Sequence, residues 1–189
     1  FSLVLMLLVL AVVSELFRLE TKRIKVSAAF LSLVLAMTLL GPAPAACLGA
    51  LVMMWSCATK RSPWQSWLAN VSTYTCFTVL GAAIFDFVGG PELLKSAPAG
   101  YVIVVFSVFM AMNVLNFLLI AIDFKVFEGW PVRRSVRQIY GPLLPVEFAT
   151  GLLTAGVAYA YQGGNLAVMG LLALICLVFQ YLIRTALSS

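Results

Sequence analysis

The stretch that decides the fold is residues 18–58, RLETKRIKVSAAFLSLVLAMTLLGPAPAACLGALVMMWSCA. It opens with the basic run Arg18–Lys25, and each Lys or Arg at a bilayer centre costs roughly 2.5–3.5 kcal/mol on insertion scales. This run therefore lies at a membrane face. Two apolar runs follow, Val26–Leu40 and Ala45–Ala58, separated by Gly-Pro-Ala-Pro at 41–44, where the prolines interrupt helical hydrogen bonding. The stretch predicts a tight helical hairpin inside a membrane.

The composition of the whole chain agrees with this interpretation. Of the 189 residues, 63% are hydrophobic and 10% are charged, against roughly 25% charged residues in soluble domains. The net charge of +5 comes from basic residues between apolar runs, where anionic lipid headgroups explain it better than nucleic acid does. The four cysteines lie within apolar runs and form no CxxC pair, and histidine is absent. We therefore expect no haem, zinc or copper site and no cofactor.

Apolar runs recur along the chain and predict an all-α, polytopic transmembrane bundle of about seven helices in a single domain. The second and third predicted helices, Val26–Leu40 and Ala45–Ala58, are shorter than the span of about 20 residues that a bilayer needs, so either the bilayer thins there or the pair is partly re-entrant. The predicted helices are Phe1–Phe17, Val26–Leu40, Ala45–Ala58, Gln65–Val88, Ala99–Ile122, Val146–Tyr161 and Leu166–Ile183.

The basic residues indicate which loops share a side of the membrane. With seven crossings, only Lys95 lies on one side, and the opposite side holds the other eleven basic residues: Arg18, Lys22, Arg23, Lys25, Lys60, Arg61, Lys125, Arg133, Arg134, Arg137 and Arg184. Because cytoplasmic loops are enriched in Lys and Arg, the sequence predicts a multi-pass cell-membrane protein with an outer N-terminus and a cytoplasmic C-terminus.

A polar connector at 123–140 separates two of the predicted helices. Val132, Val136, Ile139 and Tyr140 share one helical face, which favours an amphipathic helix lying on the membrane surface. Gly141-Pro142 and Pro145 are expected to end it. The residues expected at the membrane interface, in contact with lipid and with anionic lipids of the cytoplasmic face, are Trp64, Trp67, Trp130, Arg133, Arg134 and Arg137.

Polar residues within the spans are candidates for ligand binding, because lipid leaves such groups without hydrogen-bond partners. The candidates are Asn70, Tyr74, Asp86, Asn113, Asn116 and Gln180. The alternative for most of them is interhelical hydrogen bonding, worth about 0.6 kcal/mol per contact. Asp86 stands apart, since it lies near the outer face between Phe85 and Phe87, where a small ligand from outside could reach it.

The remaining acids and the small residues have structural interpretations. Glu15, Asp123 and Glu147 lie near the cytoplasmic helix ends, where acids are usually solvated or paired with Lys or Arg. Ala45 with Gly49, and Gly151 with Ala155, have the spacing of four typical of close helix packing. No serine–base pair, paired carboxylates, phosphate loop or metal cluster appears, so we expect no catalytic site in this segment. The chain begins within an apolar run, and we expect it to be part of a longer polypeptide.

Several short patterns carry a resemblance to a known group of proteins. They are Glu15-Leu-Phe17, a polar strand-like piece ending in Val26-Ser27, Ala28–Leu40 followed by Gly41-Pro42, the small-residue run Ala43–Leu51, Arg61-Ser-Pro-Trp64 leading to Asn70, the helix with Asn113 and Asn116, Glu128-Gly129, and Leu144-Pro145. This pattern resembles the N-terminal membrane sensor region of bacterial signalling proteins, which precedes a cytoplasmic HD-GYP phosphodiesterase or GGDEF cyclase domain. The chain departs from that pattern in its polar fourth helix.

The resemblance implies a sensory input module of a bacterial inner membrane, in which a ligand, lipid or partner signal passes to a cytoplasmic output domain. The family's catalytic residues belong to that output domain, so none is assigned here. The turn and small-residue pattern is also similar to substrate-binding membrane subunits of energy-coupling-factor vitamin transporters, which have six helices and both termini inside. A non-catalytic subunit of a larger membrane complex is a third interpretation, and a homodimer or a complex partner is compatible with all three.

Overall fold

The computed structural model describes residues 2–16, 19–20, 25–26 and 29–161, together with 167–168, 170–172, 174–175 and 178. Its elements are α1 (Ser2–Leu16), β1 (Leu19–Glu20), β2 (Lys25–Val26), α2 (Phe30–Leu40), α3 (Pro42–Thr59), α4 (Trp64–Phe87), α5 (Gly90–Ser96), α6 (Pro98–Glu128), α7 (Val132–Ser135), the π-helix η1 (Val136–Tyr140) and α8 (Gly141–Tyr161). The predicted all-α helical bundle is confirmed. The predicted seventh helix lies largely outside the described residues.

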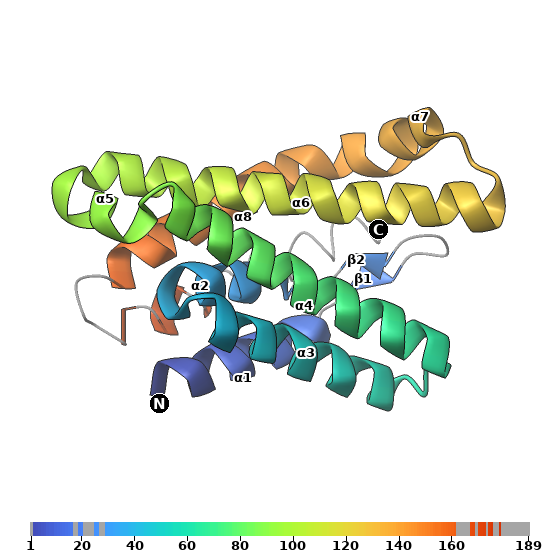
Figure 1. The fold of residues 1–189 in the computed structure, drawn as a ribbon, viewed down its shortest axis with the longest axis horizontal. Helices are drawn as coiled ribbons and strands as arrows, with labels where there is room; N and C mark the ends of the chain where they lie inside the picture. The colour runs from blue at the N-terminus through green and yellow to red at the C-terminus, as the bar shows by residue number, and fades with distance from the viewer. Residues whose placement is uncertain are drawn as a thin grey trace.

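The long helices run back and forth along one axis, so the molecule has two ends (Figure 1). We call one of them the α7 end; it holds the α3–α4 turn (Lys60–Pro63) and the segment Gly129–Tyr140 with α7 and η1. The other, the α5 end, holds the α2–α3 junction at Gly41 and the segment Val88–Ala97 with α5. Consecutive long helices therefore point in opposite directions, as in a polytopic membrane bundle.

In the part of the chain that the structure describes, four helices are long and apolar enough to cross a membrane: Pro42–Thr59, Trp67–Phe87, Pro98–Ile122 and Gly141–Tyr161. Ser2–Glu15 and Phe30–Leu40 are shorter apolar helices. This architecture makes the chain a membrane protein. The predicted helix Ala45–Ala58 is longer than expected, because the prolines at 42 and 44 begin α3, where the first N–H groups lack helical partners in any case.

The short helix α2 forms the centre of the bundle. Nine of its 11 residues are buried, from Phe30 to Thr38, and it packs against α1, α3, α4, α6 and α8. At about 1.5 Å per residue it covers only about half of the hydrocarbon thickness. Because protein surrounds it, α2 needs no contact with lipid and is apolar on all sides.

The prediction of a helix from Val26 is wrong at its start. Residues 25–26 instead pair with residues 19–20 in a short antiparallel hairpin, with Leu19 opposite Val26 and Glu20 opposite Lys25. Pairing with a second segment satisfies the backbone groups that a helix would otherwise satisfy. The chain becomes helical only at Phe30.

The boundaries around the connector also differ from expectation. The helix α6 continues to Glu128, past the predicted end at Ile122, so the first residues of the 123–140 connector belong to α6. The helix α8 begins at Gly141 rather than at Val146 and contains Pro145. Pro142 follows the π-helix η1 without a break, because Gly141 between them is helical and donates its N–H to the Val136 carbonyl oxygen. Val132 and Tyr140 pack near Phe117 and Ala121 of α6, whereas Val136 is exposed.

The expected close packing of small residues is present. A Cβ on Gly49 would lie 2.9 Å from the Tyr74 carbonyl oxygen, and one on Gly151 would lie 2.9 Å from the Phe109 ring. These glycines let α3 approach α4, and α8 approach α6.

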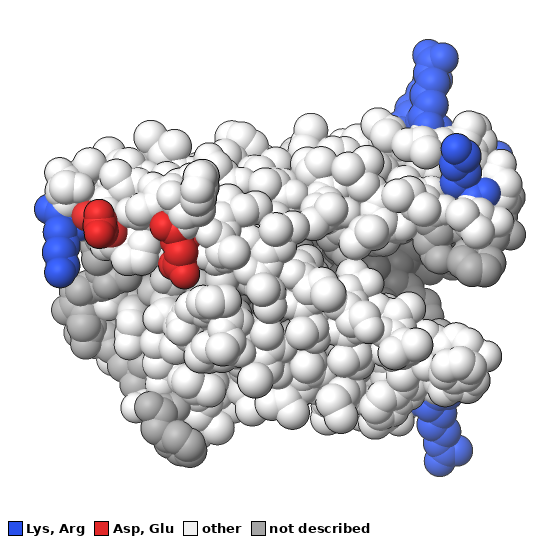
Figure 2. All heavy atoms as spheres, viewed as in Figure 1, with Lys and Arg blue, Asp and Glu red and all other residues white. Residues whose placement is uncertain are grey.

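The charges separate between the two ends. Figure 2 shows blue side chains above and below at the right-hand end, and red side chains beside a further blue group at the left-hand end. Among the described residues, the α7 end includes Lys60, Arg61, Arg133, Arg134 and Arg137, and the α5 end includes Lys95 and Glu92. The faces between the two ends are white in this view, as expected for surfaces in contact with lipid.

Candidate ligand-binding site

A pocket of about 400 Å³ opens at the α5 end of the bundle. It is lined by Met37, Thr38, Leu39, Gly41, Asp86, Pro91, Lys95 and Tyr101. These residues come from the end of α2, the α2–α3 junction, the end of α4, the helix α5 and the start of α6. The volume lies within the range of about 300–1,000 Å³ typical of small-molecule sites.

Glycines bring these helix ends together. Gly41 has φ 83° and turns the chain from α2 into α3, and Gly89 has φ 72° and turns it from α4 into α5. Side chains other than glycine rarely adopt such positive φ values. A Cβ on the next residue, Gly90, would lie 2.4 Å from the Phe85 ring. The absence of that Cβ lets α5 close over Phe85 and form one wall of the pocket.

The pocket contains two opposite charges. Asp86 lies in the last turn of α4 and Lys95 in the last turn of α5, and both residues are exposed. No described residue forms a hydrogen bond or an ion pair with either side chain. Among the described residues, neither side chain has a partner that would compete with a ligand in the pocket.

Met37, Thr38 and Tyr101 provide the buried part of the lining. The Thr38 hydroxyl donates to the Val34 carbonyl oxygen at 3.1 Å, so its lone pairs can still accept a hydrogen bond. The Tyr101 ring is fully buried and meets Phe85 edge-on, with ring centroids 5.9 Å apart. The pocket thus has an apolar floor and a charged rim.

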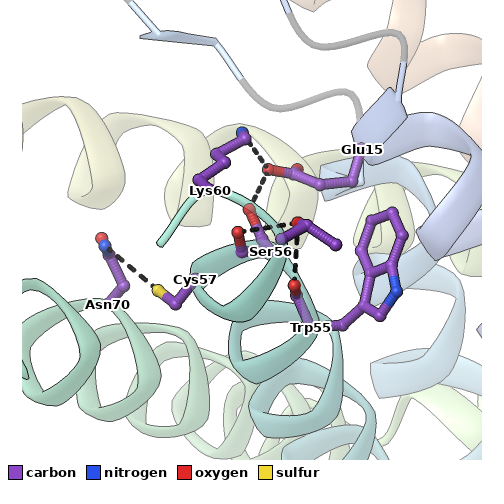
Figure 3. A network of polar contacts seen from close by, with 7 residues as sticks. Glu15, Trp55, Ser56, Cys57, Lys60 and Asn70 are labelled. Carbon is purple, nitrogen blue, oxygen red and sulfur yellow. Dashed lines mark hydrogen bonds and ion pairs between the residues drawn. The ribbon is translucent and has the colours of Figure 1, made fainter. Parts of the chain in front are cut away.

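Of the five predicted ligand residues that the structure describes, only Asp86 lines this pocket. Asn70 is exposed on α4, and its Nδ2 lies 3.9 Å from the Cys57 Sγ of α3 (Figure 3). Tyr74 is half-buried and packs edge-on against Phe77, with ring centroids 5.0 Å apart. Asn70 thus meets α3, and Tyr74 also packs against the buried cluster of Ala11, Ala29, Val52 and Met53; neither residue lines the pocket.

The predicted pair on α6 faces α8 instead. Asn113 is buried and donates its Nδ2 to the Glu147 Oε2 at 2.6 Å, while Asn116 is half-buried. The pKa of the adjacent Tyr140 phenol is raised by burial and then by the Glu147 carboxylate. The hydrogen bond between Asn113 and Glu147 thus joins α6 to the start of α8. Gln180, the remaining candidate, lies outside the described residues.

The residues expected at the membrane interface occupy the α7 end of the bundle. Trp64 is 70% exposed at the start of α4, and Trp67 in the same turn is half-buried. The Arg134 guanidinium lies over the Trp130 ring, 4.2 Å from its centroid. Arg133, Arg134 and Arg137 are exposed. Aromatic rings and cations together suit a headgroup layer.

A buried polar network at the α7 side joins α1 to α3 (Figure 3). The Glu15 Oε1 accepts a hydrogen bond from the Ser56 Oγ at 2.8 Å and lies 3.4 Å from the Lys60 Nζ. The Glu15 side chain is 1% exposed. The prediction that such acids pair with Lys or Arg is confirmed for Glu15.

Sequence reasoning missed that Thr38, Lys95 and Tyr101 line one pocket with Asp86. One signal was present, because Lys95 is the single basic residue predicted on its side of the membrane. Thr38 and Tyr101 gave no comparable signal, since each is a common residue within an apolar run.

Comparison with protein-family models, with curated proteins and with solved structures found no match to this chain. Any assignment of function therefore depends on the membrane architecture and on the pocket with Asp86 and Lys95.

Proposed function

We propose that the chain is a membrane sensory input module, which binds a small ligand in the pocket at the α5 end and passes the signal to a cytoplasmic output domain. The observation that supports this most directly is the position of α2. Its last residues line the pocket, and its body packs against α1, α3, α4, α6 and α8. A ligand that shifts α2 would therefore disturb the packing of most of the bundle.

In this proposal the α5 end faces outside and the α7 end faces the cytoplasm. The basic residues of the α3–α4 turn and of α7 support this orientation, since cytoplasmic loops are rich in Lys and Arg. Anionic lipids of the inner leaflet would then contact the Arg133–Arg137 segment. The resemblance to the membrane sensor regions of bacterial signalling proteins supports the same direction of signalling.

Signal transfer requires two states of the bundle with different affinities for the ligand. Helices that pack around a central rigid element can repack as a unit rather than deform continuously. The helix α2 is such an element, because almost all of its side chains are buried.

The proposal is tested first by the intact mass of the native polypeptide, with peptide sequencing beyond Ser189. A soluble output domain after Ser189 is expected. A native chain that stops near Ser189 overturns signalling through an attached domain. Ligand that copurifies with such a chain would then favour the transporter subunit, and a stoichiometric protein partner would favour a subunit of a larger complex.

A second test measures the output activity of the native polypeptide in lipid nanodiscs. Replacing Thr38 with phenylalanine fills the pocket beside α2, and we expect this variant to change the output activity. Leu68→Phe is the matched control, because Leu68 is exposed on α4 and does not line the pocket. Equal activities of the two variants and the unmodified protein would argue against signal transfer from the pocket.

A further inference from the structure

We propose that the pocket at the α5 end binds a small zwitterion with an apolar body, the chemistry of a free apolar amino acid. This inference depends on the pocket used in the proposed function and adds the chemical class of its ligand. It follows from the charges, the helix ends and the apolar lining of the pocket.

Two charged side chains of opposite sign line the pocket. Asp86 and Lys95 both line the pocket, and no described residue neutralises either side chain. A ligand with a single charge would pair with only one of these two side chains. A ligand that carries an ammonium and a carboxylate satisfies both groups at once. Hydrogen bonds between ionised groups are also about twice as strong as neutral ones.

The helix ends support the same separation of charge. Gly41 lines the pocket directly before the start of α3, where Ala43 is the one residue of the first three whose backbone N–H can donate to a carboxylate, because residues 42 and 44 are prolines. Asp86 lies in the last turn of α4, where the partial charge is negative and favours an ammonium. The Thr38 hydroxyl, whose proton is donated to the Val34 carbonyl, offers a further acceptor for an ammonium. The ligand's carboxylate is thus assigned to Lys95 and its ammonium to Asp86.

The remaining lining is apolar and limits the size of the ligand. Met37, Leu39, Pro91 and the buried Tyr101 ring supply surfaces for a hydrocarbon group. The volume of about 400 Å³ lies near the lower end of the range for ligand sites. A single amino acid fits this description better than a peptide does.

The test uses the native full-length polypeptide in lipid nanodiscs and isothermal titration with L-leucine, L-methionine and L-phenylalanine. We expect the polypeptide to bind at least one of these three amino acids. Asp86→Asn and Lys95→Gln should each weaken this binding by about tenfold to a hundredfold, as expected for a hydrogen bond to a charged group. Glu92→Gln and Arg61→Gln are the matched controls, because both residues are exposed, carry the same charges and lie outside the pocket lining. These two control variants should bind the amino acid with the same affinity as the unmodified protein.

Two analogues of leucine separate the roles of the charges. L-leucinamide keeps the ammonium and lacks the carboxylate, and 4-methylpentanoate keeps the carboxylate and lacks the ammonium. Asp86→Asn should weaken the binding of L-leucinamide and leave 4-methylpentanoate unchanged, and Lys95→Gln should do the reverse. Failure of all three amino acids to bind overturns the proposal, as does binding that neither substitution weakens or that follows the opposite pattern.

The outcomes also separate this inference from the proposed function. A chain that binds an amino acid but ends near Ser189 supports the ligand class and refutes signalling through an attached domain. A chain with an output domain that binds none of the amino acids refutes the ligand class alone.

Discussion

Replacing Lys60 with glutamine should destabilise the bundle more than replacing Glu15, although both residues belong to the same ion pair. The Glu15 carboxylate is almost fully buried, with 1% of its side chain exposed, whereas the Lys60 side chain is 34% exposed. Lys60→Gln removes the cation that pairs with the buried Glu15 carboxylate. Glu15→Gln removes the buried charge itself and leaves an ammonium that water can reach.

The expected loss in the free energy of unfolding follows from the distance between the two charges. Two unit charges 3.4 Å apart attract by about 5 kcal/mol at an effective dielectric constant of about 20. Because a third of the Lys60 side chain is exposed, water and salt screen part of this attraction, and we expect Lys60→Gln to cost about 2–3 kcal/mol. A glutamine at position 15 keeps an oxygen for the hydrogen bond from Ser56, so Glu15→Gln should cost about 1 kcal/mol. The double variant should also lose only about 1 kcal/mol, because it holds no buried carboxylate at that position.

The assay is unfolding by sodium dodecyl sulfate in mixed micelles, followed by tryptophan fluorescence. Arg61→Gln is the matched control, since Arg61 lies in the same turn, is exposed and has no described ion-pair partner. The reasoning is refuted if Lys60→Gln costs no more than Arg61→Gln. If the loss of stability in the double variant equals the sum of the losses in the two single variants, the two charges are not coupled, and the reasoning is also refuted.

Three further substitutions test the packing, the polar contacts and the orientation. Gly49→Ala should cost about 1–3 kcal/mol in the same unfolding assay, because its Cβ would lie 2.9 Å from a backbone oxygen of α4. Gly156→Ala should be neutral or slightly stabilising, since its Cβ meets nothing within 4 Å, and equal losses at the two sites would contradict this. Asn113→Ala should cost about 1–3 kcal/mol, because it removes the donor 2.6 Å from a carboxylate of α8; an unchanged midpoint would show that this contact contributes little. In a cysteine-free background, Ser96→Cys should react with an impermeant maleimide in intact cells and Ser62→Cys only after permeabilisation, and the reverse pattern would invert the proposed orientation.

The helices themselves could be predicted because apolar length is a property of each segment. The turns at Gly41 and Gly89, both with positive φ, lie next to predicted helix ends, whereas Gly129 lies within the predicted connector. The errors occurred where a segment's structure depends on another part of the chain or on its direct continuation. Residues 25–26 are extended because residues 19–20 pair with them, and α6 passes Ile122 because a helix can continue beyond the hydrocarbon layer as long as its backbone bonds persist.

The candidate site was predictable only in part. Asp86 could be singled out because it is the acid expected near the outer face, between Phe85 and Phe87. Thr38, Lys95 and Tyr101 could not be linked to it, since they lie 48 residues before it and 9 and 15 residues after it in the sequence. Asn70 and Asn113 were equally plausible candidates, yet one faces Cys57 and the other faces Glu147.

The sequence by itself therefore determined that this is a helical membrane protein with basic residues gathered at one end of the bundle, because hydrophobic length and charge placement act locally along the chain. Only the tertiary structure decided that α2 is the buried centre and that Asp86 and Lys95 share a pocket. These features depend on which helix faces meet, and many arrangements of equally apolar helices would satisfy the same local preferences.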